Sequence, residues 1–319
     1  MKGDLAPLEN KNTICVINLM HCLIILLHIM EDTVVILSCV RNCEKYLPES
    51  IANMQNIGKL FKSYSIVFYE NDSTDKTLHI LQQYANKPGS CIKIISTSLK
   101  SHPDNVYRTW RLAIARQALL NYVAEMPTEN RPTYVIVMDA DDVATHNNTA
   151  GVKFIESALS KKQHWDGCFP ALTYDKWAYR TVNHMSNFWE LRTLARFNII
   201  PFNKNQEYEH KLDIASKIFN NNNLQPVKSA FNGIGIYKTS VYVTGTYSGR
   251  NQVHNILNLD QRKRLLSCMI RHFQDNTNAK TTIYSRFEEE CEHVPFHISL
   301  GEKAKLHCCS EVNYPGENF

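Results

Sequence analysis

The sequence predicts an α/β protein built on a doubly wound, mostly parallel sheet. Short β-branched runs alternate with helical segments through the first half of the chain, and this alternation is typical of such sheets. Polar side chains also gather where the predicted strands end. A chain of 319 residues is long enough for one large α/β domain with a sizeable core.

Four apolar, β-branched runs have the length of buried strands, at residues 34–37, 65–69, 92–95 and 134–138. Helical patterns follow them, at about residues 44–58, 73–84, 108–124 and 152–161. Pro48 lies near the start of the first helix, where proline is tolerated. Ser73 or Thr74 is the expected cap of the second. Residues 220–223 are typical of a polar loop.

The N-terminal segment, residues 14–30, is mostly apolar but is interrupted by three polar residues. A spanning helix needs roughly 20 apolar residues. Lysines before the segment and acidic residues after it fit a signal anchor with a cytosolic N-terminus. Because a strand is expected to begin at Thr33, no stem would remain between a membrane and the domain. This favours a packed or peripheral helix instead of an anchor. Both interpretations stay open, and membrane association through residues 14–30 is one of them.

Charge and cysteine usage exclude other classes. The net charge of +4 is spread along the chain, and the basic cluster at residues 262–264 lies in a helical pattern. Such a cluster is typical of a solvated face, so we expect no nucleic-acid partner. The ten cysteines contain no Cys-x-x-Cys pair, so neither a zinc site nor a disulfide framework is indicated.

Asp139 and Asp141 follow the predicted strand 134–138 directly. Side chains two apart in an extended segment point the same way, so both carboxylates can reach one hard divalent cation. Two carboxylates leave positions for a diphosphate, whose charge the metal would stabilise. The alternative is a solvated turn with Asp142 as a helix cap. The preceding apolar strand and the similar strand ends upstream favour the metal site.

The other strand ends carry further candidates, because ligands of such sheets bind beyond the carboxyl ends of the strands. Residues 38–42 follow the first strand, and residues 70–77 follow the second. Carboxylate, amide and hydroxyl groups on the second loop suit a nucleobase edge and a ribose. The alternative is an ordinary capped turn.

Arginines begin the third predicted helix. Arg108 and Arg111 share a helix face, and guanidinium groups suit phosphate. Surface solvation is the alternative for both, and equally for Arg116.

The C-terminal half contains two clusters of interest. Residues 288–297 combine carboxylates, a base for an acceptor hydroxyl among them, with two imidazoles able to complete a metal shell. In the segment 174–180, Trp177 could stack on a sugar while Asp175 binds its hydroxyls. The alternative for residues 288–297 is an acidic helix end with core histidines. The alternative for residues 174–180 is an aromatic core cluster with an ion pair.

These motifs carry a resemblance. Residues 69–77 resemble the Asp-Asp-Gly-Ser-x-Asp-x-Thr segment of GT-A glycosyltransferases of the cellulose and chitin synthase group, and Met138 to Asp142 resembles their metal-binding motif. More specifically, the Glu-Asn-Asp-Ser loop and the segments 111–117, 174–180, 227–233 and 290–293 resemble fungal capsule-type α-1,3-mannosyltransferases and related viral or uncharacterised proteins. The similarity covers about residues 33–310.

The resemblance implies a GT-A fold, Mn²⁺ or Mg²⁺, a GDP- or UDP-linked sugar donor and a glycan acceptor. It implies a nucleotide-sugar-binding half at 33–148 and an acceptor half at 149–319, within one domain that follows residues 1–32. Glu292 is the expected base of an inverting reaction. The expected donor-binding residues are Ser38, Arg41, Asn42, Glu70, Asp72, Asp75, Arg108, Arg111 and Asp139. Metal ligands are expected at Asp139, Asp141 and His293. Acceptor or sugar contacts are expected at Asp142, Asp175, Trp177, Arg180 and Asn232.

The sequence departs from the family pattern at two positions, and two other classes of protein are alternatives to a glycosyltransferase. Glu70-Asn71 replaces the usual Asp-Asp, and Gln117 stands where asparagine is common, which leaves the nucleotide open. A nucleotidyltransferase would carry a Gly-rich loop after the first strand, and residues 38–42 contain no glycine. A catalytically inactive carbohydrate-binding protein is the other rival. Glycosylation sequons at Asn71 and Asn147 would flank the site, and glycans there would obstruct it, which argues against a secretory lumen. The expected location is cytoplasmic or membrane-associated, with the cytoplasm favoured and a type II anchor still open.

Overall fold

The computed structural model describes residues 31–142, 149–171, 175, 177–181, 224–250, 260, 263–264, 267 and 289–313. The predictions for residues 14–30 and 220–223, for the sequon at Asn147 and for Arg262 of the basic cluster lie outside this part. No helix within it is both long and apolar enough to cross a membrane.

The first half of the sheet is a parallel block of four strands in the order β3-β2-β1-β4. Their bounds are β1 Thr33–Val40, β2 Ser63–Glu70, β3 Ile92–Ser96 and β4 Tyr134–Met138. All four predicted strands are therefore confirmed. The order reverses between β1 and β4, and this switch point is where doubly wound sheets open a crevice beyond the strand ends.

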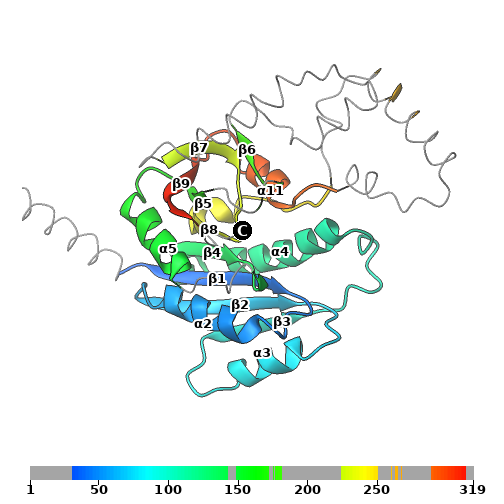
Figure 1. The fold of residues 1–319 in the computed structure, drawn as a ribbon, viewed down its shortest axis with the longest axis vertical. Helices are drawn as coiled ribbons and strands as arrows, with labels where there is room; N and C mark the ends of the chain where they lie inside the picture. The colour runs from blue at the N-terminus through cyan, green and yellow to red at the C-terminus, as the bar shows by residue number, and fades with distance from the viewer. Residues whose placement is uncertain are drawn as a thin grey trace, which may run out of the picture.

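Among the described residues, the second half extends the sheet to nine strands in the order β3-β2-β1-β4-β8-β5-β9-β7-β6. Strand β8 pairs antiparallel with β4, and β5 pairs antiparallel with β8 and parallel with β9. The bounds are β5 Gly167–Ala171, β6 Arg180–Thr181, β7 Leu224–Ser229, β8 Ile234–Lys238 and β9 Leu306–Asn313. The expected class, a doubly wound sheet flanked by helices with an antiparallel part, is confirmed (Figure 1).

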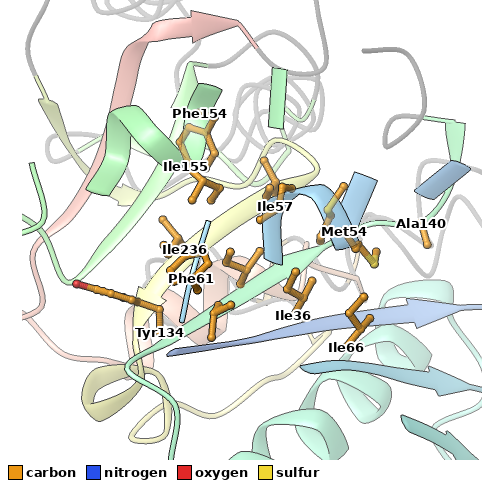
Figure 2. Packing of buried hydrophobic residues seen from close by; sticks show 14 of the residues in the cluster. Ile36, Met54, Ile57, Phe61, Ile66, Tyr134, Ala140, Phe154, Ile155 and Ile236 are labelled. Carbon is orange, nitrogen blue, oxygen red and sulfur yellow. The ribbon is translucent and has the colours of Figure 1, made fainter. Parts of the chain in front are cut away.

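Two apolar layers cover the sheet because successive side chains of a strand point to opposite faces. Val34 and Ile36 of β1 join one buried cluster, and Val35 and Leu37 join the other. The first cluster includes side chains of α2 (Leu47–Gly58), α3 (Thr77–Ala85) and α5 (Ala150–Ser160), and Figure 2 shows part of it. The second includes α4 (Arg108–Ala124), α8 (Thr239–Tyr242) and α11 (His293–Ser299).

The helix starts differ from the predictions in two places. Helix α2 begins at Leu47 rather than at residue 44, with Pro48 in its first turn. Helix α3 begins at Thr77, so the predicted capping by Ser73 or Thr74 is wrong. The Ser73 hydroxyl instead accepts a hydrogen bond from the Asn42 N–H at 3.1 Å, and Asp75 accepts one from the Thr77 N–H at 2.9 Å. Ser73 is thus bonded to the segment that follows β1, and Asp75 to the first residue of α3.

Candidate functional site

A cavity of about 710 Å³ lies beyond the carboxyl ends of β1 and β4. These two strands pair in parallel, so the residues that follow them meet at the switch point. Residues at the start of α4, around residue 175 and at the start of α11 complete its walls. The lining consists of Cys39, Val40, Arg41, Asn42, Cys43, Tyr46, Asn71, Arg108, Thr109, Arg111, Leu112, Arg116, Asp139, Ala140, Asp141, Asp175, Trp177, Phe231, Cys291, Glu292 and His293.

Asp139 and Asp141 both line this cavity. The Asp139 N–H donates to the Gly233 carbonyl at 2.9 Å, which fixes the backbone where β4 ends. Gly233 has φ +82°, a left-handed conformation that favours glycine. Burial raises the pKa of Asp139 to about 7, and the negative charges of Asp141 and Glu292 add to the rise, while Arg116 opposes it.

Arg116 is the centre of the charged cluster. Its side chain is only 3% exposed, so surface solvation, the alternative considered for it, is wrong. Its Nη2 donates to Asp139 Oδ1 at 2.9 Å, and its Nε donates to Glu292 Oε1 at 2.8 Å. The guanidinium carbon also lies 5.1 Å from the centre of the Phe231 ring. One buried cation thus joins the end of β4 to the start of α11.

Glu292 and His293 lie where the chain enters α11. The Glu292 side chain is 5% exposed. The His293 ring stacks on Phe231 with 3.7 Å between ring centres, and neither ring nitrogen has a hydrogen-bond partner among the described residues. Burial, with the neighbouring Arg116, lowers the pKa of His293 well below its ordinary value, so the ring is neutral.

Asp175 and Trp177 reach the same cavity from the C-terminal half. Asp175 Oδ1 accepts hydrogen bonds from the N–H groups of Trp177 and Ala178, both at 3.1 Å. Burial raises the pKa of Asp175 to about 6, although these two backbone hydrogen bonds act to lower the pKa. Asn232, a predicted sugar contact, does not line the cavity, and its side-chain oxygen instead accepts the Asp175 N–H at 3.0 Å.

Three further arginines line the cavity, namely Arg41, Arg108 and Arg111. Burial lowers the pKa of Arg111, and the positive charges of Arg41 and Arg108 add to this effect. Arg111 is therefore close enough to be repelled by both Arg41 and Arg108, while Glu289 acts in the opposite direction. A wall with this charge favours an anionic ligand such as a diphosphate.

Of the predicted donor loop after β2, residues 70–77, Asn71 lines the cavity, whereas the carboxylate residues Glu70, Asp72 and Asp75 are not among the lining residues. Glu70 is 3% exposed, and its two oxygens accept from the Ser73 N–H at 2.9 Å and the Ser96 hydroxyl at 2.6 Å. Asp72 accepts from Ser98 and Leu99 in the same way, at 2.7 and 2.9 Å.

Asp75 accepts the Glu44 N–H at 3.1 Å, and Asn42, which does line the cavity, accepts the Thr74 N–H at 2.8 Å. These bonds hold residues 42–44 against the second loop. Contacts of Glu70, Asp72 and Asp75 with a donor stay predictions, since their carboxylates already have partners here.

Arg180 is also placed away from the cavity. Its side chain is fully buried, and its Nη2 donates to Glu290 Oε1 at 2.9 Å. Its Nη1 donates to the carbonyls of Trp177 and Tyr179. The ion pair supports the strand that follows Trp177, so Arg180 is placed as a structural residue. Ser38 and Asp142 are likewise not among the lining residues.

Some lining residues were not anticipated from the sequence. For Arg116, which was a candidate phosphate contact, the buried ion pairs were missed, although a signal was present, because it falls on the α4 face that Leu119, Leu120 and Val123 bury. A charge on an apolar face needs a buried partner. Cys39, Cys43, Tyr46, Phe231 and Cys291 gave no comparable signal.

The oxygen and nitrogen atoms that line the cavity match the ligands that a divalent cation takes. Asp139, Asp141 and Glu292 supply carboxylate oxygens to one cavity. The buried His293 ring has no hydrogen-bond partner in the described chain, and its Nε2 lies 3.7 Å from Glu292 Oε1. Within that part, no three His, Cys, Asp or Glu side chains form a ready-made metal cluster. Such a set fits a cation that takes one or two carboxylates and completes its shell with phosphate oxygens.

Comparison with known proteins gives one family and several remote structural similarities. The model of a family described as glycosyl transferase family 2 matches residues 34–201, more than half of the chain. A search of curated proteins finds no match.

Among solved structures, S. aureus TarS 1-349 in complex with UDP-GlcNAc is 12% identical, over 88% of this chain and 57% of that one, with a TM-score of 0.40. Glucosyl-3-phosphoglycerate synthase from Mycobacterium tuberculosis, in complex with Mn²⁺, UDP and phosphoglyceric acid, is 12% identical over 67% of this chain and 58% of that one, with a TM-score of 0.37. This chain thus spans less than three fifths of the length of either structure.

Proposed function

Because this chain belongs to glycosyl transferase family 2, we propose that it transfers a hexose from a nucleotide-sugar donor to a hydroxyl group of a glycan or similar acceptor. The observation that carries the proposal is that Asp139, Asp141 and Glu292 line one cavity at the switch point of the sheet. A fold alone does not define a reaction, and these side chains are the groups that supply the chemistry.

The donor side is assigned to the strand ends and to α4. Asp139 and Asp141 are the carboxylates that would hold Mn²⁺ or Mg²⁺, which would stabilise the charge on the departing diphosphate. The positive wall of Arg41, Arg108 and Arg111 would hold the phosphates from the protein side. UDP- and GDP-linked hexoses, GDP-mannose among them, are the donors to test.

The acceptor side is assigned to Asp175, Trp177 and Glu292. In an inverting transfer, Glu292 takes the proton of the acceptor hydroxyl as its oxygen forms a bond to the anomeric carbon. The bond from that carbon to the phosphate oxygen breaks, and its electron pair leaves with the nucleoside diphosphate. Trp177 offers an aromatic face for the apolar side of a sugar ring, and Asp175 offers an oxygen for its hydroxyls.

A thermal-shift screen tests the donor assignment, because a ligand that binds the native state raises its melting temperature. We expect a UDP- or GDP-linked hexose to raise the melting temperature of the wild-type chain, and more so with Mn²⁺. The Asp141→Asn variant should lose the part that depends on Mn²⁺. A nucleotidyltransferase would respond to a free nucleoside triphosphate instead. An inactive binder would show the shift without releasing nucleoside diphosphate, and no shift with any nucleotide sugar would contradict the proposal.

A further inference from the structure

Arg116 bridges the two sides of the cavity with one guanidinium group. Its Nη2 bonds Asp139 Oδ1 at 2.9 Å and its Nε bonds Glu292 Oε1 at 2.8 Å. Each donor therefore serves a different carboxylate, whereas an arginine that pairs with a single carboxylate commonly uses both donors on it. The planar group fixes the separation of the two carboxylates more strictly than a lysine could.

The burial of this bridge makes the cation indispensable to both carboxylates. The side chains of Arg116 and Glu292 are 3% and 5% exposed, and that of Asp139 is 25% exposed. A buried carboxylate without a countercharge is costly, and three carboxylates around one cavity would together form an oxygen-rich site for a hard cation. A base whose oxygens bind a metal cannot accept a proton from an acceptor.

We propose that Arg116 is a positioning residue for the transfer reaction: it holds Glu292 at a fixed distance from Asp139 and, as their shared countercharge, keeps Glu292 from joining Asp139 and Asp141 around the metal. This inference rests on the proposed function for the roles of the three carboxylates. It adds a division of labour, in which the metal stays on the donor side and the base stays free on the acceptor side.

The first test uses Mn²⁺ alone and the ligand-free chain, so it requires no turnover. Titration calorimetry would compare the wild type with Arg116→Met and Arg116→Lys. Removal of the positive charge should tighten Mn²⁺ binding by about tenfold or more, because Asp139 and Glu292 then lose the cation that they share. Arg116→Lys keeps the charge and should stay close to wild type. Mn²⁺ binding by Arg116→Met that is unchanged or weaker would overturn the proposal.

Arg180→Lys is the matched control for this titration, because Arg180 is another buried arginine with a carboxylate partner, Glu290, and lies outside the cavity wall. Its Mn²⁺ affinity should equal that of the wild type. A general loosening of the fold would alter Mn²⁺ binding in both arginine variants, whereas the loss of a countercharge affects Arg116→Met only.

The second test is a double-mutant cycle on the release of nucleoside diphosphate from a nucleotide sugar with Mn²⁺. Arg116→Lys should lower kcat by about 100-fold, the usual cost of a misplaced catalytic group, while the donor KM changes by less than about threefold. In the Glu292→Gln background the same substitution should have almost no further effect, because Arg116 acts through Glu292.

Losses that multiply in the double variant would overturn the proposal, as would a full kcat in Arg116→Lys. This cycle also decides the matter if Arg116→Met does not fold. A wild-type chain that binds and turns over no nucleotide sugar would contradict the proposed function instead, and the Mn²⁺ titration would still report whether Arg116 keeps Glu292 away from the metal.

Discussion

Replacement of Arg180 by methionine tests the structural assignment of this residue. The side chain of Arg180 is 0% exposed and that of its partner Glu290 is 6% exposed. The substitution leaves the Glu290 carboxylate buried without its cation, which costs about 3–5 kcal/mol in comparable pairs. The carbonyls of Trp177 and Tyr179 lose their Nη1 donor as well. We expect the free energy of unfolding to fall by at least about 3 kcal/mol, against a total of roughly 5–15 kcal/mol for a natural domain.

Urea denaturation of the wild type and Arg180→Met measures this difference directly. The paired variant, Arg180→Met with Glu290→Leu, should recover at least half of the loss, because an apolar pair of similar volume removes the buried charge. Nucleotide-sugar affinity per folded molecule should stay within about threefold of wild type. The reasoning is refuted if Arg180→Met unfolds within about 1 kcal/mol of wild type, or if it loses donor affinity while keeping its stability.

Three other predictions concern protons and the loop after β2. Burial lowers the pKa of His297 to about 3, so the unfolded chain takes up a proton below about pH 6.5 that the folded chain refuses. Stability is thus lost as the pH falls from about 6.5 towards 3, by up to about 1.4 kcal/mol per pH unit. Urea titrations at pH 4.5 and 6.5 should show a smaller loss in His297→Gln, and an equal loss would count against this. The pKa of Asp139 is about 7 in the metal-free chain, and Mn²⁺ binds the deprotonated carboxylate. Mn²⁺ affinity should therefore rise with pH by up to about tenfold per unit and level off above about pH 7. Titration calorimetry that finds a Mn²⁺ affinity independent of pH would contradict this prediction. Glu70→Ala should lower the unfolding free energy by about 2–3 kcal/mol, since two hydrogen bonds to a buried carboxylate are lost, whereas an unchanged stability with weaker nucleotide binding would favour the original donor role.

The sequence predicted the elements whose signals are local. The strands β1, β2 and β4 are apolar runs rich in β-branched residues, and such runs fit a sheet covered on both faces. Asp139 and Asp141 were identified as site residues because they follow one of these strands. The parallel pairing of β1 with β4 then brings them beside Arg41 and Asn42 at the cavity.

The partners of the charged side chains could not be predicted in the same way. Arg116 and Glu292 are 176 residues apart in sequence, and Arg180 and Glu290 are 110 apart. No periodicity links such positions, so for Arg116 a phosphate contact and a solvated side chain both stayed open, and Arg180 was predicted to contact a sugar. Glu70 has the residue type of a ligand-binding carboxylate, yet Ser73 and Ser96 occupy its oxygens. Residue type indicates what a group can bind, and only the fold decides which partner reaches it.

The division of roles around Arg116 makes Glu292 the group to change in a decisive experiment. Glu292→Gln keeps an oxygen for the Arg116 bond and removes the ability to accept a proton. The measurement is the release of nucleoside diphosphate from a nucleotide sugar with Mn²⁺, together with donor affinity on the same samples. We predict wild-type donor affinity within about threefold and a kcat at least about 100-fold lower, the usual contribution of a general base. A Glu292→Gln chain that turns the donor over at the wild-type rate would contradict the assignment of this cavity as the transfer site with Glu292 as its base.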